Sequence, residues 1–179
     1  MNEKLCHVLH YLIYLAQTRN WPVRTKIRLA KSVIFAEIAT LHYLQRPLTS
    51  IQVVKTADGA LPFKFEENLQ WLLKTKRIGA PITVTNPTAN KYESLISPDI
   101  SSFIAEEVEI IAAMGSICCQ KYTDPVLINF NNTRNWEMVK VGEVVPVSTY
   151  VALDDEPSES TGLSQEELDD IDRLLKNPL

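Results

Sequence analysis

The sequence predicts a mainly α-helical protein: a compact helical domain with a short strand and a small β-hairpin, followed by a C-terminal tail helix. Apolar residues recur at helical spacing in several stretches. Residues 81–96 instead hold two β-type runs around a turn. A polar, acidic segment broken by proline and glycine precedes the last amphipathic stretch. We therefore expect a domain over residues 1–151, a linker over 152–163 and a tail helix over 164–176.

Composition agrees with an ordinary globular chain. Of the 179 residues, 45% are apolar, which is typical of a protein with one hydrophobic core. The longest apolar helical stretch, near the N-terminus, is interrupted by histidines and tyrosines, so neither a membrane span nor a signal peptide is indicated. The three cysteines form no spaced disulfide framework. We expect a soluble, cytoplasmic protein with free thiols and no membrane partner.

The first two helices are predicted by periodicity. Asn2 stands at the N-cap position of the first, and the second follows the break at residues 19–22. We expect the second helix to be buried along most of one side. The stripe on that side consists of Ile27, Ala30, Ile34, Ile38 and Leu41.

The middle of the chain predicts a strand, a third helix and a hairpin. Ile51 and Val53 begin an alternating run that ends in an Asp-Gly turn. Pro62 suits the first turn of the third helix, and residues 81–96 read as the hairpin. Helix, strand, helix and hairpin in this order loosely resemble a winged helix.

A fourth helix is predicted to begin at Ser97, with Ser97 as cap, Pro98 in the first turn and Asp99 at the positive end of the dipole. Its apolar residues stand at 100, 103, 104, 108, 111 and 114. A short helix closed by Gly142 and an extended exit are expected to end the domain.

Four cations gather where the second helix begins: Arg24, Lys26, Arg28 and Lys31. The helix dipole disfavours positive charge at this end, so helix stability does not explain them. We expect them to be exposed there, either solvating the helix end or meeting an acidic partner.

The tail has the opposite charge. Residues 150–179 carry nine acids against two cations, a charge of −7, and since the whole chain is −4 the remainder is +3. The predicted tail helix has one apolar stripe, and about twelve residues are too few for a stable isolated helix. The stripe must therefore dock, either on the chain's own body or, helix in groove, on a partner protein. It consists of Leu168, Ile171, Leu174 and Leu175.

Catalytic motifs are missing from the sequence. It holds no Gly-rich phosphate loop, no G-x-S-x-G, no H-E-x-x-H and no C-x-x-C. His7 and His10 could share a metal ion, but no further ligand is placed to complete a site, and we interpret them as surface or partly packed histidines. Trp71 and Trp136 are interpreted first as core residues and second as interface hot spots. We expect no enzyme, no cofactor and no metal.

Three blocks of the sequence resemble the Panacea antitoxin-domain family, which includes SocA-like and phage-associated proteins. "TKIRLAKSVIFAE" is similar to the family's K-L-L-Y-F-A-D helix through Lys31, Phe35 and Ala36. "LQRPLTSIQVVKTADGALP" resembles its R-P-hydrophobic-T segment and Gly-Pro turn through Pro47, Gly59 and Pro62. "NFNNTRNWEMVKVGEVVP" is similar to its Trp and Gly-Glu-x-Ile-Pro ending through Trp136, Gly142, Glu143 and Pro146, with Asn131 where the family has His.

The resemblance implies an antitoxin, a protein that neutralises a co-encoded toxin by binding it and in some members delivers it to a protease. Two alternatives remain open. A DNA-binding regulator would apply the basic start of the second helix, or Lys74, Lys76 and Arg77, to operator DNA, although +3 is a small charge for a phosphate-binding surface. A proteolytic adaptor would use the same protein-binding faces as an antitoxin.

Overall fold

The computed structural model describes residues 1–21, 25–57, 59–79, 82–83, 90–121 and 138–147. Within these ranges the fold is mixed α/β and mainly helical, with a three-stranded antiparallel sheet and a separate two-stranded hairpin. The helices are α1 (Glu3–Thr18), α2 (Lys26–Leu44), α3 (Phe65–Lys74), α4 (Ala105–Ser116) and a π-helical turn, η1 (Ile117–Lys121). The strands are β1 (Gln52–Thr56), β2 (Gly59–Pro62), β3 (Ile82–Thr83), β4 (Asn90–Lys91) and β5 (Val144–Pro146).

Helix α1 begins as the sequence predicts. The Asn2 side chain accepts a hydrogen bond from Leu5 N at 3.0 Å, so the N-cap is confirmed. The helix is more deeply buried than an amphipathic surface helix, since Cys6, Val8, Leu9 and Leu12 have essentially no exposed surface. One face of α1 carries polar residues, and that face has a structural use described below.

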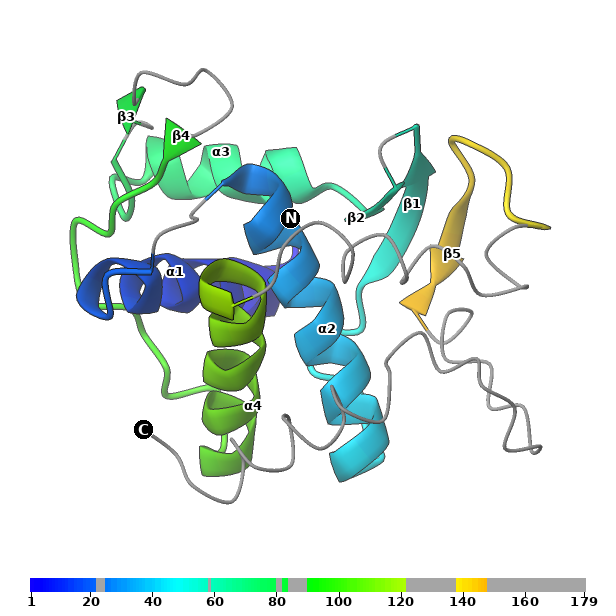
Figure 1. Cartoon of the computed structure of the whole chain (residues 1–179), viewed down its shortest axis with the longest axis horizontal. Helices are drawn as coiled ribbons and strands as arrows, with labels where there is room; N and C mark the ends of the chain where they lie inside the picture. Colours follow the sequence, from blue (N-terminus) through cyan, green and yellow to red (C-terminus); the bar gives the residue numbers. More distant parts are fainter. Residues whose placement is uncertain (22–24, 58, 80–81, 84–89, 122–137, 148–179) are drawn as a thin grey trace.

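Helix α2 is the centre of the domain. It lies between α4 on one side and the sheet on the other (Figure 1). Every residue from 28 to 37 is buried, so the expectation of burial along one side only is wrong. Ile27, predicted to face the core, is 50% exposed. Neighbours on opposite sides therefore bury α2 more completely than its own hydrophobic periodicity indicates.

The sheet has the strand order β2-β1-β5. The predicted strand is β1, and Val53 at its centre pairs with Pro62 on one side and Val145 on the other. Gly59, with φ of 108°, turns the chain from β1 into β2. Pro62 therefore ends a strand, and its prediction as the first turn of a helix is wrong: α3 begins at Phe65. Pro62 and Pro146 both lie on strands that flank β1, where a missing N–H is tolerated.

Helix α4 begins seven residues later than predicted. Ser97 and Pro98 belong to an irregular segment, and the first helical residue is Ala105. Asp99 does not cap a helix, because its carboxylate accepts from the backbone N–H and the hydroxyl of Ser101 at 2.9 and 2.7 Å and closes a local turn. The helix is capped instead by Glu107, which accepts from Ile104 N at 3.1 Å.

The predicted hairpin of residues 81–96 is present as β3 and β4, which pair through two residues each. The extended exit after Gly142 is β5. Of the predicted helix before Gly142, only residues 138–141 are described. Trp136, the acidic linker and the tail residues Leu168, Ile171, Leu174 and Leu175 lie outside the described residues. Among the described helices, none is both long enough and apolar enough to cross a membrane.

Candidate protein-binding surface

The four predicted binding cations do not form one exposed cluster. Lys26 is partly exposed and pairs with Glu66 of α3. Arg28 and Lys31 are 9% and 2% exposed, so the expectation of an exposed basic helix end is wrong for both. Arg28 donates from Nη1 to the Cys118 carbonyl at 3.1 Å, within the π-helical turn where the helical hydrogen-bond pattern changes. Arg24 lies outside the described residues.

Lys31 is a buried lysine of α2. Burial lowers its pKa from an ordinary 10.5 to about 8. The neighbouring Cys118 thiol is buried too, and its pKa is raised by the same cause. A buried lysine cannot act as a surface charge that attracts a partner protein. Its lowered pKa instead makes the stability of the fold depend on pH.

That dependence is testable. Between pH 8 and about 10.5 the unfolded chain holds a proton that folded Lys31 has released, so stability rises with pH in this window. Relative to Lys31→Met, the wild-type free energy of unfolding should increase by about 1 kcal/mol from pH 8 to pH 9. Urea unfolding of both proteins measures it. Ionisation of the cysteine thiols in the unfolded state lowers stability at higher pH in both proteins, so it cancels in the difference between wild type and Lys31→Met. Parallel pH profiles of the two proteins would contradict the prediction.

The family-motif residues gather around α2 and the sheet. Phe35 and Ala36 are buried in α2, and Lys31 precedes them on the same helix. The other described motif positions lie on or beside the two strands that flank β1. Gly59 and Pro62 are the first and last residues of β2. Pro146 ends β5, and Gly142 and Glu143 immediately precede that strand. The turn at β5 is held by Gly142 N and Glu143 O, which bond Lys55 O and N at 2.8 and 3.1 Å. Pro47 is exposed in the turn after α2.

Glu37, which the sequence analysis did not single out, joins α2 to that turn. Its carboxylate is 1% exposed and accepts from Thr49 N, Thr49 Oγ1 and Ser50 N at 2.7–2.9 Å. Burial raises the pKa of Glu37, and the Thr49 and Ser50 hydrogen bonds partly offset this. One acid within an otherwise apolar helical run was the available signal in the sequence.

The segment from 93 to 104, between β4 and α4, is the most distinctive surface feature, and we call it the strap. It runs antiparallel to α1 and is bonded to it along one helix face. Gln17 Oε1 accepts from Ser94 N at 2.7 Å, His10 Nε2 lies 2.9 Å from Ser94 Oγ, and His7 Nδ1 lies 3.3 Å from Ser102 Oγ. At the far end the Lys4 ammonium lies 5.6 Å from the centre of the Phe103 ring.

His10 is the only fully buried member of this row, with 0% exposure. Its Nε2 also lies 3.2 Å from the Ile96 carbonyl, which can only accept, so the neutral ring carries its proton on Nε2. Burial lowers the pKa of His10, and the Ile96 carbonyl partly offsets this. His7 and His10 thus bind the strap, and among the described residues no group of three potential ligands could hold a metal ion.

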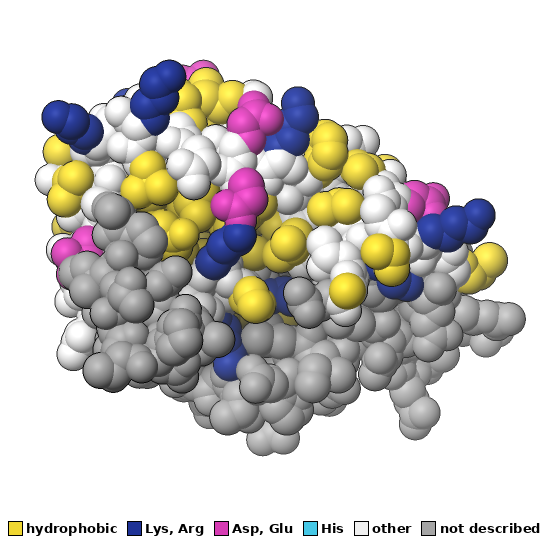
Figure 2. Space-filling view, turned by 90° about the horizontal axis from the view of Figure 1, so that it is seen from above, with side chains coloured by type: hydrophobic (Ala, Val, Ile, Leu, Met, Phe, Trp, Pro, Cys, Tyr) yellow, Lys and Arg dark blue, Asp and Glu magenta, His cyan; other side chains and the backbone are white. Residues whose placement is uncertain are grey.

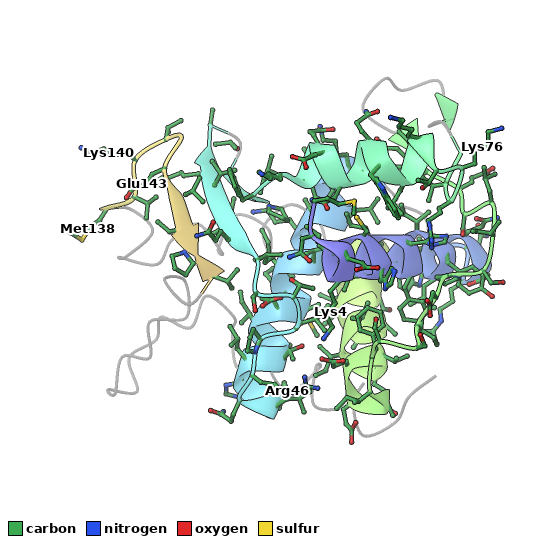
Figure 3. All side chains as sticks on the ribbon, turned by 180° about the vertical axis from the view of Figure 1, so that it is seen from behind. Lys4, Arg46, Lys76, Met138, Lys140 and Glu143 are labelled. Atoms are coloured by element: carbon green, nitrogen blue, oxygen red, sulfur yellow. The ribbon has the colours of Figure 1, made fainter. Side chains whose placement is uncertain are left out.

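Glu107 anchors the end of the strap. One carboxylate oxygen receives Lys4 Nζ at 3.0 Å and Arg46 Nη2 at 3.1 Å, while the other caps Ile104 N. Lys4 and Arg46 approach this point from α1 and from the end of α2 (Figure 3). The carboxylate is 1% exposed but its cations are 30% and 44% exposed, so a buried acid is compensated by charges at the surface.

The strap exposes aliphatic side chains. Leu95, Ile96, Ile100 and Ile104 are 57, 51, 39 and 48% exposed. Ile100 and Ile104 are predicted among the apolar residues of the fourth helix, and the late start of α4 places them on the strap instead. The strap is held at both ends and in the middle by its contacts with α1 and Glu107. Its apolar side chains are therefore already positioned, which lowers the conformational entropy that a partner's binding would cost.

A second exposed apolar pair lies elsewhere. Met138 and Val141, in the turn before β5, are 78% and 70% exposed. Met138, Lys140 and Glu143 are at the end of the molecule opposite Lys76 (Figure 3).

No protein-family model, no curated protein and no solved structure matches this chain.

Proposed function

We propose that this protein is an antitoxin that acts by binding, not by catalysis, and that the strap is part of the surface that holds the toxin. The observation that supports it most is the presentation of four large aliphatic side chains on a segment fastened to α1. The family resemblance supplies the toxin as partner. Delivery of the toxin to a protease would use the same face and differ only in the toxin's fate.

The exposed aliphatic side chains of the strap are informative because they lie close together in the sequence. Isolated apolar side chains are normal on protein surfaces, but four within ten residues form a candidate patch. Burying a complete Leu or Ile side chain is worth about 1.5–3 kcal/mol, so covering the exposed half of each of the four gives a partner a substantial gain.

Binding of operator DNA is the alternative, and one feature favours it. Lys74 and Lys76 are exposed at the end of α3, and the Arg77 guanidinium lies 5.3 Å from the Trp71 ring. In the view onto this side, lysines and arginines stand singly among acidic and hydrophobic side chains (Figure 2). With Arg28 and Lys31 buried, a winged-helix type of DNA contact through the start of α2 loses two of its cations.

The test is a pair of matched double variants. Ile96→Asp with Ile100→Asp puts two charges on the strap, and Met138→Asp with Val141→Asp puts the same charges at the other apolar pair. The toxic product of the adjacent reading frame is co-expressed with each. We expect the strap variant to bind it at least about 30-fold more weakly, as loss of a hot spot does, and to fail to protect cells, while the control protects.

Both variants must keep the wild-type melting temperature. A protective strap variant beside a control that no longer protects would move the site to the turn before β5. An adjacent product that is harmless, or that is not bound by the wild type, would contradict the antitoxin proposal. Salt-sensitive binding of duplex DNA, lost on Lys74→Glu with Lys76→Glu, would support the regulator instead.

A further inference from the structure

We propose that the strap is a proton-operated latch, released when His10 becomes protonated. This inference concerns the regulation of the surface assigned above, and its consequence for a partner rests on the proposed function. The latch itself is a property of the isolated chain and is tested without a partner.

The geometry makes His10 the central fastening. It is completely buried beneath the strap and reaches two of its groups, the Ser94 hydroxyl at 2.9 Å and the Ile96 carbonyl at 3.2 Å. Ser94 Oγ also donates to the same carbonyl at 2.7 Å. Any motion that lifts residues 94–96 from α1 must therefore break both contacts of His10 with the strap and expose the imidazole to water.

The closed strap does not suit a charged imidazole. Nε2 already carries a proton, so protonation adds one at Nδ1, a buried atom with no hydrogen-bond partner among the described residues. The Arg77 carbonyl, which favours positive charge on the imidazole, already accepts from Leu95 N at 2.9 Å. The Ile96 and Arg77 carbonyls offset only part of the cost of a buried positive charge, and the effect of burial is larger.

The charged groups around His10 increase this cost. Arg77, in the connection after α3, and His7, one helical turn away on α1, both disfavour positive charge on His10. Asp99 of the strap interacts electrostatically with both Arg77 and His7 but is exposed. The lowered pKa of His10, caused mainly by burial, agrees with this arrangement.

Acid is expected to favour the lifted state of the strap. In the lifted state His10 is exposed and has its ordinary pKa near 6.5, while in the closed state the pKa is lower. Below pH 6.5 the lifted state therefore binds the proton more readily, and acid favours release. From pH 7.5 to pH 5.5 the population of the lifted state should rise, by at most about tenfold, which is the limit that one such histidine can contribute over this range.

Hydrogen exchange measures the latch directly. The amides of Ser94 and Leu95 donate to Gln17 Oε1 and Arg77 O across the two sides of the strap. Their protection factors, corrected for intrinsic exchange, should fall from pH 7.5 to pH 5.5, by up to about tenfold. In His10→Gln, whose amide can still donate to the Ile96 carbonyl but does not titrate, protection should be flat. The control His42→Gln, at the exposed end of α2, should keep the wild-type fall.

A second readout does not depend on a variant folding. In the wild type the His10 ring should titrate below the ordinary pKa of about 6.5, and the backbone resonances of Ser94 and Ile96 should move with it. Protection that stays constant over this pH range, a His10→Gln protein that keeps the pH-dependent change, or a His10 ring that titrates at the ordinary pKa of about 6.5 would each overturn the latch. All of these outcomes leave toxin binding near neutral pH, and so the proposed function, untouched.

Discussion

Truncation of Trp21 to alanine should lower the free energy of unfolding by about 3–5 kcal/mol, a large fraction of the stability of a single domain. Trp21 is 2% exposed and is the largest of the fully buried side chains. It follows α1 directly, and its backbone N–H donates to the Ala16 carbonyl at 2.9 Å. The ring is thereby held against α4, so its removal leaves a cavity between two helices that cannot easily close.

The contact with α4 occurs at Gly115. A Cβ atom on this residue would lie 2.7 Å from both the Trp21 ring and the Leu12 side chain, closer than real Cβ contacts. Gly115→Ala alone should therefore cost about 1–3 kcal/mol through overpacking. In the Trp21→Ala background the same substitution should cost much less, because the space is then open. The double-mutant cycle reports this coupling.

Trp71 supplies the matched control for Trp21. It is only partly buried, and Arg77 lies over its ring. Trp71→Ala should thus lose clearly less stability in urea unfolding at equal protein concentration. Equal losses for the two tryptophans, or additive effects of Trp21→Ala and Gly115→Ala, would mean that Trp21 does not occupy the interface between α1 and α4.

Glu37→Ala should destabilise the fold by about 3–5 kcal/mol. Three donors, Thr49 N, Thr49 Oγ1 and Ser50 N, would lose their acceptor, and each buried donor left unsatisfied costs about 1–3 kcal/mol. The loss is smaller than the full sum, because the variant no longer buries a carboxylate whose pKa burial has raised. The turn after α2, which positions β1, should loosen with it.

Two variants sharpen this result. Glu37→Gln keeps one oxygen acceptor and should lose less than Glu37→Ala. Glu109→Ala removes an exposed glutamate on α4 and should stay within about 0.5 kcal/mol of wild type. If chemical unfolding showed Glu37→Ala to be as stable as Glu109→Ala, the carboxylate would not be what holds the turn.

The sequence by itself determined the features that depend on neighbouring residues. Asn2 caps α1 because an asparagine at that place can accept from the third residue on, and the Gly59 turn follows β1 because glycine tolerates positive φ. Helices α1 and α2 and strand β1 lie where periodicity predicts them. None of these features requires knowledge of what packs against them.

Only the tertiary structure decided burial, pairing and the start of α4. Arg28 and Lys31 are covered because α4 and the sheet enclose both sides of α2, which no local pattern encodes. Ser97 and Pro98 have the side chains of a helix start, but their segment is hydrogen-bonded to His10 and Gln17 of α1. The helix begins further on, where Glu107 caps it. Lys4 and Arg46 hold the Glu107 carboxylate in place. Long-range hydrogen bonds and ion pairs outweigh a local capping preference of about 1 kcal/mol, and so the four exposed aliphatic side chains of the strap were decided by contacts distant in sequence.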